Sequence, residues 1–152
     1  MPESVCVVDK SQARYIYGIS YLSALSALYA LYRKYYALAV VPGGVFLTSV
    51  LFWRDPRRDC WARYADVLYV QFAFFFQLYR ARNAQYLKAY LAAMALALCS
   101  FGGGVYLTWR WDILNLVDAA ERSRKMWAVT LLHSGVHVFG NLGNMVLYSG
   151  TV

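Results

Sequence analysis

The chain has 152 residues, of which 61% are hydrophobic and 15% are charged, and its mean hydropathy is +0.39. Soluble domains are about 45–50% apolar and 25% charged, so this composition excludes an ordinary soluble domain and predicts that lipid covers part of the surface. The length leaves room for one compact domain. The net charge of +7 comes from basic residues scattered over short connections. This distribution favours anionic lipids at a basic face and gives no indication of nucleic-acid binding.

Five apolar segments follow one another along the chain. They cover about residues 15–32, 35–53, 62–79, 86–109 and 126–148. Each is close to the roughly 17–25 residues that cross a bilayer as a helix. None alternates polar and apolar residues at period two, which excludes strands. The sequence therefore predicts an all-α fold, a polytopic transmembrane bundle of about five spans, with residues 1–14 as an N-terminal tail and 15–152 as a single transmembrane domain.

Two features leave the number of spans open. Only Arg33 and Lys34 separate the first two segments, and Pro42-Gly43-Gly44 interrupts the second. A kinked or half-length second helix, and with it an arrangement of four spans, stays open beside the preferred five. Between the last two segments, apolar residues recur at helical spacing among charged ones, which predicts a short interfacial helix over about residues 112–125.

The distribution of basic and aromatic residues predicts an orientation. With five spans, ten Lys and Arg residues fall on the side of the N-terminus and five on the other side. The positive-inside rule then places the N-terminus in the cytoplasm, matrix or stroma and the C-terminus outside. Aromatic rings at span ends are expected at headgroup level, as belts. The expected belt on the positive side consists of Trp53, Trp61, Trp109, Trp111 and Trp127, and the opposite one of Tyr29, Tyr32, Tyr35, Tyr36, Tyr79, Tyr86 and Tyr148.

The N-terminus and the cysteines bear on localisation. Glu3 and Asp9 argue against an acid-poor transit peptide, and the first apolar segment is longer than the core of a signal peptide, so no cleavable signal is expected. Cys6, Cys60 and Cys99 have no C-x-x-C spacing, so no disulfide framework is implied. We expect an integral protein of an organellar membrane or an endomembrane.

The only two histidines, His133 and His137, lie four residues apart in the last apolar segment. This spacing points both imidazoles to the same face of a helix, and the polar positions continue along that face as Asn141, Asn144 and Tyr148. A polar stripe in an apolar span is costly unless it faces the interior of a bundle or a site. Interhelical hydrogen bonds, a metal site, and a pigment, haem or proton role are three open interpretations of the histidine pair.

Two further polar residues are expected at similar depth on other helices. Ser49 lies about one turn inside the positive end of the second segment, and Asp66 lies about one turn inside the third. Asp66 is the one acidic residue expected inside a span, which makes it a candidate for a functional site. In the alternative interpretation, Ser49 bonds the carbonyl four residues back, and Asp66 forms a salt bridge. The arginines available to Asp66 are Arg57, Arg58 and Arg63.

These residues resemble the zinc site of the CREST-type superfamily of alkaline ceramidases and progestin/adiponectin-type receptors. In that family, a Ser and a His four apart on the second helix, an Asp on the third and His-x-x-x-His on the last build a zinc site for amide hydrolysis. The resemblance implies that Ser49 and Asp66 are catalytic and that His133 and His137 bind zinc. Trp53 stands where the family has its third histidine. The family also has seven spans, whereas this chain has room for five.

A second likeness concerns short membrane proteins. The segments 48–58 and 137–144, together with Asp66, are similar to those of short uncharacterised membrane proteins of algae, protists and large DNA viruses. No activity is attached to those proteins. This likeness therefore supports the membrane assignment and leaves the function open.

The first functional hypothesis is a small membrane metalloenzyme or a lipid-sensing relative of the ceramidase-like proteins. Zinc would polarise a lipid amide and activate water, Asp66 would orient or deprotonate that water, and Ser49 would steady the oxyanion. A hydrolytic zinc usually has three protein ligands, so this function requires Asp66 or Cys99 beside the two histidines. The incomplete ligand set favours a protein that is not an efficient enzyme.

The second hypothesis is a non-catalytic accessory subunit of a large organellar assembly, such as a respiratory, ATP synthase or photosynthetic complex. Small size, short connections and glycines favour helix packing, both within the chain and with other membrane-protein subunits. The glycines concerned are Gly102-Gly103-Gly104 and Gly140-x-x-Gly143. A transporter is disfavoured, because five spans without inverted repeats give little basis for alternating access.

Overall fold

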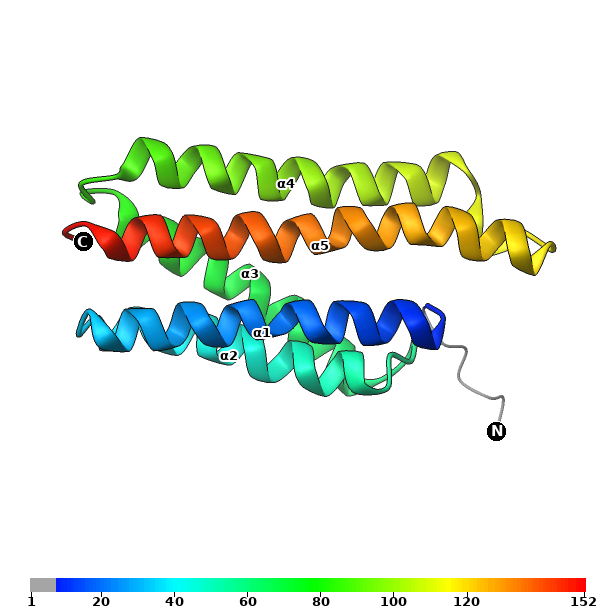
Figure 1. Ribbon diagram of the computed structural model, residues 1–152, viewed down its shortest axis with the longest axis horizontal. Coiled ribbons are helices and arrows are strands. Elements are labelled where there is room, and N and C mark those ends of the chain that lie inside the picture. Colours follow the sequence, from blue (N-terminus) through cyan, green and yellow to red (C-terminus); the bar gives the residue numbers. More distant parts are fainter. Residues whose placement is uncertain (1–7) are drawn as a thin grey trace.

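The computed structural model describes residues 8–152, and this part of the chain forms helices joined by short connections. The elements are α1 (Lys10–Tyr32), α2 (Tyr36–Arg54), α3 (Trp61–Ala81), α4 (Leu87–Arg110), a short 3-10 turn η1 (Ile113–Asn115) and α5 (Ala119–Ser149). Successive helices run in opposite directions, and α3 crosses behind the others obliquely (Figure 1). Helix α5 packs between α4 and α1, and α2 packs between α1 and α3. The predicted all-α fold is confirmed for the described residues.

Helix α1 begins within the segment predicted as a tail, because polar side chains fix its first turn. Asp9 is the N-cap, and its backbone N–H donates a hydrogen bond to Gln12 Oε1 at 3.1 Å. Gln12 Nε2 in turn donates to the carbonyl of Ser123 at 3.1 Å, and Ser123 Oγ donates to Asp9 Oδ2 at 2.7 Å. The start of α1 is therefore bound to the start of α5. Residues 1–7, including Glu3 and Cys6, lie outside the described part of the chain.

Helix α2 is continuous through Pro42, so neither a half-length helix nor a division of the helix occurs there. Proline has no N–H to donate to the carbonyl four residues earlier, which belongs to Leu38. The Tyr148 hydroxyl donates to that carbonyl at 3.4 Å and accepts a hydrogen bond from Gln77 Nε2 at 2.5 Å. Tyr148 is fully buried, so its predicted place in a headgroup belt is wrong. Its hydroxyl instead joins α2, α3 and α5.

The predicted interfacial helix at 112–125 does not form as a separate element. Residues 119–125 are the first two turns of α5, preceded by η1 and a short extended connection. Asp118 caps α5 by accepting from the N–H groups of Ala120 and Glu121, and a Glu121–Lys125 ion pair of 2.8 Å spans the first turns. The 31 residues of α5 measure about 46 Å at ~1.5 Å per residue. The helix is therefore longer than a bilayer core of about 30 Å.

The bundle buries many small and polar side chains and exposes many large apolar ones. The buried polar residues are Gln12, Ser20, Ser23, Ser26, Ser49, Gln77, Thr130, Ser134, His137, Asn141 and Asn144. Leu28 on α1, Phe75 on α3 and Leu98 on α4 are among the large apolar residues that are exposed, by 60%, 66% and 53%. Large apolar side chains are buried as well, among them Ile16, Leu38, Phe52 and Leu147, each at most 5% exposed. Buried polar side chains together with large exposed apolar ones are features expected where lipid surrounds a helical bundle.

Two of the described helices, α2 and α4, are long and apolar enough to cross a membrane by length and composition. The polar content of the other three helices lies largely between helices or near helix ends. Helix α1 buries three serines against its neighbours, and α5 buries its stripe from Thr130 to Asn144. The charged residues of α5 lie in its first two turns, at 121–125. These positions lower the average hydropathy of α1 and α5, whereas α3 exposes a polar side chain, Gln71, near its middle.

Only some of the glycines predicted to allow close helix approach do so. A Cβ atom on Gly143 would lie 2.5 Å from Met94 Cε and 3.3 Å from Ala93 Cβ, both on α4. A Cβ atom on Gly140 or Gly102 would meet nothing within 4 Å. The close contact between α4 and α5 at this level therefore depends on Gly143.

We predict that Gly143→Leu lowers the free energy of unfolding by roughly 1–3 kcal/mol, because the added side chain must displace Met94 and Ala93. The matched control is Gly140→Leu, three residues earlier on the same helix in open space. Denaturation of both variants in detergent, followed by loss of helical circular dichroism, measures the difference. Equal destabilisation by the two variants would contradict the packing described.

Candidate intramembrane polar site

Asp66 is held by hydroxyl groups of the neighbouring helix. The Oγ1 of Thr48 and the Oγ of Ser49, both on α2, each donate to Asp66 Oδ1 at 2.8 Å. Among the described residues Asp66 forms no ion pair, so the salt-bridge interpretation is wrong. Ser49 bonds this carboxylate and not the carbonyl four residues back. Ser49 and Asp66, which were expected at similar depth, therefore bond each other and join α2 to α3.

The two histidines form an aromatic group with Trp53. The ring centroids of His133 and His137 lie 5.3 Å apart, and the Trp53 ring lies edge-on to His133 at 5.1 Å. Trp53 is only 6% exposed, so it faces the interior and is not part of a headgroup belt. Residue 53 of α2 thus lies beside the histidine pair. The resemblance to the zinc hydrolases implies a third histidine ligand at this position, but the residue here is a tryptophan.

The two groups do not combine into a metal site. Within residues 8–152, no group of three or more His, Cys, Asp or Glu side chains is placed to hold a metal ion. Asp66 therefore does not complete a ligand set with His133 and His137, and Cys99 is an exposed residue of α4. A hydrolytic zinc with three protein ligands does not fit these side chains.

The C-terminal part of the polar stripe on α5 forms hydrogen bonds with α1. Ser26 Oγ donates to Asn141 Oδ1 at 2.7 Å, and Asn141 Nδ2 donates to Ser23 Oγ at 3.1 Å and to the carbonyl of His137 at 2.7 Å. Asn144 is buried one turn further along, and its Oδ1 has no hydrogen-bond partner in the described part of the chain. The Asn141 amide thus has both its oxygen and its nitrogen satisfied by neighbouring groups, as a buried amide requires.

Sequence reasoning identified Asn141 in this network and missed its serine partners on α1. Ser20, Ser23 and Ser26 recur every three residues, a spacing that places small hydroxyl residues along one side of a helix. That pattern, opposite a predicted polar stripe, was the available signal, and Ser23 and Ser26 are the two serines that bond Asn141. Gln77 gave no such signal, although its partner Tyr148 lies on the predicted polar stripe.

Comparison of this chain with protein-family models, with curated proteins and with solved structures gives no match. The assignment of function therefore rests on the residues and their contacts.

Proposed function

We propose that the chain is an integral membrane protein that crosses the bilayer five times, with its N-terminus on the positively charged side. The single observation that carries this proposal is the combination of serines and asparagines buried between the helices with large apolar side chains exposed outside, such as Leu28, Phe75 and Leu98. Lipid is the surroundings in which that distribution is stable. An organellar membrane or endomembrane is the proposed location.

We further propose that the intramembrane polar cluster binds helices together and does not catalyse hydrolysis. Asp66 has its hydrogen bonds to α2, and Asn141 has its hydrogen bonds to α1. Trp53 fills the position at which a third metal ligand would lie beside His133. In this proposal the cluster resembles the ceramidase site but lacks one metal ligand, and its hydrogen bonds hold the helices together.

This proposal predicts that Trp53→His completes a zinc site. The wild-type chain, purified in mild detergent, should hold no stoichiometric zinc, whereas the variant should hold about one zinc per chain, because three imidazoles and a water satisfy the tetrahedral preference of zinc. Elemental analysis per chain measures the content.

Two controls make this result specific. Trp53→Phe introduces no ligand and should leave the zinc content unchanged, and Trp53→His combined with His137→Ala should lose the zinc again. About one zinc in the wild-type chain, removed by His133→Ala, would contradict the non-catalytic proposal and restore the metalloenzyme hypothesis.

A second candidate function is that of an accessory subunit in a larger membrane assembly. The observation that favours it is the position of α3, which packs mainly on α2 and leaves an aromatic face exposed. The exposed residues of this face are Leu68, Phe72, Phe75 and Tyr79. Such a face is suited to packing against the helices of other membrane-protein subunits.

If the chain is an accessory subunit, native electrophoresis of digitonin-solubilised membranes should show it in an assembly several times larger than its own 17.3 kDa. Phe72→Ala combined with Phe75→Ala should release it, since these rings lie outside the bundle, while helix content stays unchanged. A lone monomer in its detergent micelle would contradict this second candidate.

A further inference from the structure

Two cavities adjoin each other near the end of the bundle where α2 ends and α3 begins. The first, about 280 Å³, is lined by residues of α1 to α5 and of the connection between α2 and α3, and the second, about 420 Å³, lies between α4 and α5. Four residues line both of them. They are Thr108, Leu114, Val129 and His133. The two cavities therefore form adjacent chambers with a shared wall.

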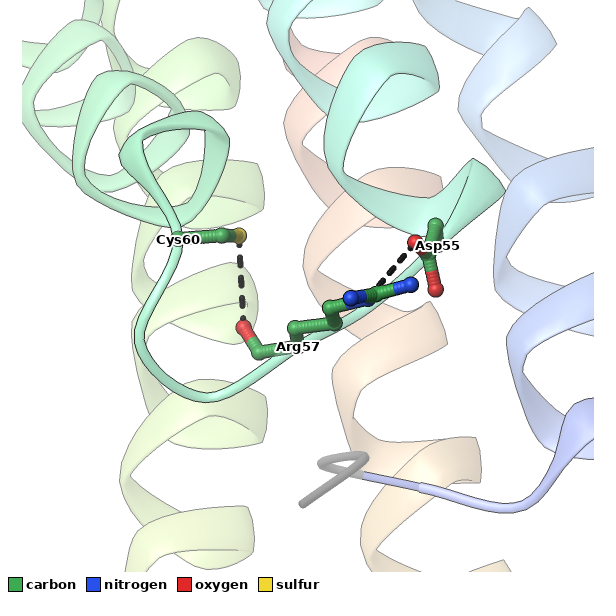
Figure 2. A network of polar contacts seen from close by, with 3 residues as sticks. All are labelled: Asp55, Arg57 and Cys60. Carbon is green, nitrogen blue, oxygen red and sulfur yellow. Dashed lines mark hydrogen bonds and ion pairs between the residues drawn. The ribbon is translucent and has the colours of Figure 1, made fainter. Parts of the chain in front are cut away.

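The first chamber carries two positive charges that have no counter-charge within residues 8–152. Arg58 and Arg63 line it, and neither forms an ion pair with any described residue. Arg63 lies in the first turn of α3, where the helix dipole adds positive potential, and its Nη1 donates to the carbonyl of Arg58 at 2.9 Å. The neighbouring Arg57 differs, because its Nε donates to Asp55 Oδ2 at 2.8 Å, as Figure 2 shows.

The same connection between α2 and α3 is held in a defined shape. Cys60 Sγ donates to the carbonyl of Arg57 at 3.3 Å, which closes the turn before α3 (Figure 2). Together with the bond from Arg63 to the Arg58 carbonyl, this contact fixes the backbone on either side of Arg58. The two unpaired arginines are therefore presented by an ordered loop.

Two buried polar groups on the wall of this chamber lack partners. Trp53 Nε1 and Thr130 Oγ1 are buried and have no hydrogen-bond partner within residues 8–152. Both residues line the first chamber, at 6% and 1% exposure. A buried donor without an acceptor costs about 1–3 kcal/mol, so these groups favour a ligand that brings acceptor oxygens.

The second chamber is mainly apolar. Its walls include Phe101, Val105, Trp109 and Val129, and Gly104 leaves space between α4 and α5. Asp112 also lines it, but this residue is exposed and its Oδ1 accepts from Asn115 Nδ2 at 2.9 Å. The chamber thus suits a hydrocarbon chain and not a second charged group.

We propose that the two chambers bind one anionic phospholipid, with its phosphate in the first chamber and an acyl chain in the second. Arg58 and Arg63 pair with the phosphate oxygens, and Trp53 Nε1 and Thr130 Oγ1 donate to oxygens on its deeper side. Charge-assisted bonds from guanidinium groups to phosphate are among the strongest hydrogen bonds in proteins. This inference rests on the proposed membrane insertion, because the arginines must then lie at headgroup level.

The test uses the full-length chain in a neutral detergent, titrated by calorimetry with dioctanoyl phosphatidic acid, dioctanoyl phosphatidylcholine and inorganic phosphate. Phosphatidic acid should bind at least about tenfold more tightly than either of the other two probes. Arg58→Gln combined with Arg63→Gln should weaken that binding about tenfold or more, as expected for loss of two charged hydrogen bonds. The matched control, Arg54→Gln combined with Arg110→Gln, removes the same charge from exposed residues of the same side that line neither chamber.

A further variant tests whether the apolar chamber binds the acyl chain. Val105→Trp fills it from an exposed position, so it should weaken phosphatidic acid binding and leave the binding of inorganic phosphate unchanged. Inorganic phosphate that binds as tightly as the lipid would overturn the two-chamber proposal, because the acyl chain would then contribute nothing. Equal losses in the Arg58/Arg63 and Arg54/Arg110 variants would overturn it by showing diffuse attraction to a basic surface.

Alkaline carbonate extraction of membranes that contain the same variants tests membrane insertion separately from the lipid site. A chain that stays in the membrane but shows no preference for phosphatidic acid refutes the lipid site alone. A wild-type chain that carbonate releases refutes the proposed membrane insertion.

Discussion

The structure depends on one interaction, the hydrogen bonding between polar groups buried among apolar helices. Three interhelical contacts consist of such bonds. Asp66 joins α3 to α2, Asn141 joins α5 to α1, and Tyr148 joins α5 to α2 and α3. Such bonds add specificity where lipid surrounds the bundle, because apolar side chains alone gain little by leaving lipid for a protein interface. The same residues that suggest chemistry in the sequence thus determine which helices are neighbours.

The sequence predicted five long helices, and the limits of α2, α3 and α4 fall within two residues of those expected. It placed the starts of α1 and α5 five and seven residues too late and predicted a separate interfacial helix, because the polar first turns capped by Asp9 and Asp118 do not resemble apolar spans. It placed Ser49 near Asp66 correctly, since both lie one turn from the same end of adjacent helices. It placed Trp53 in a headgroup belt, and Tyr148 both in a belt and on the inward polar stripe, because a ring at a span end looks the same in sequence whether it faces lipid or the interior. Their positions follow from partners more than 60 residues away, His133 and Gln77.

Trp53 lies beside His133, and Ser49 bonds Asp66. An indole at position 53 cannot serve as a metal ligand. It contributes instead an N–H group without a partner within residues 8–152 to the wall of a cavity that also carries two arginines without an ion pair among those residues. We therefore propose that the end of the bundle that contains Trp53 and His133 binds a phosphate group and not a metal ion.

The most direct test of the proposal that the chain crosses the membrane five times is to determine on which side of the membrane each terminus lies. Tags at the N- and C-termini of the chain, tested for protease protection in sealed membrane vesicles, report this without disturbing the bundle. Five spans place the two tags on opposite sides, with the N-terminal tag on the same side as a tag in the connection between α2 and α3. Two tags on the same side would require an even number of spans and would contradict the membrane arrangement on which the account is built.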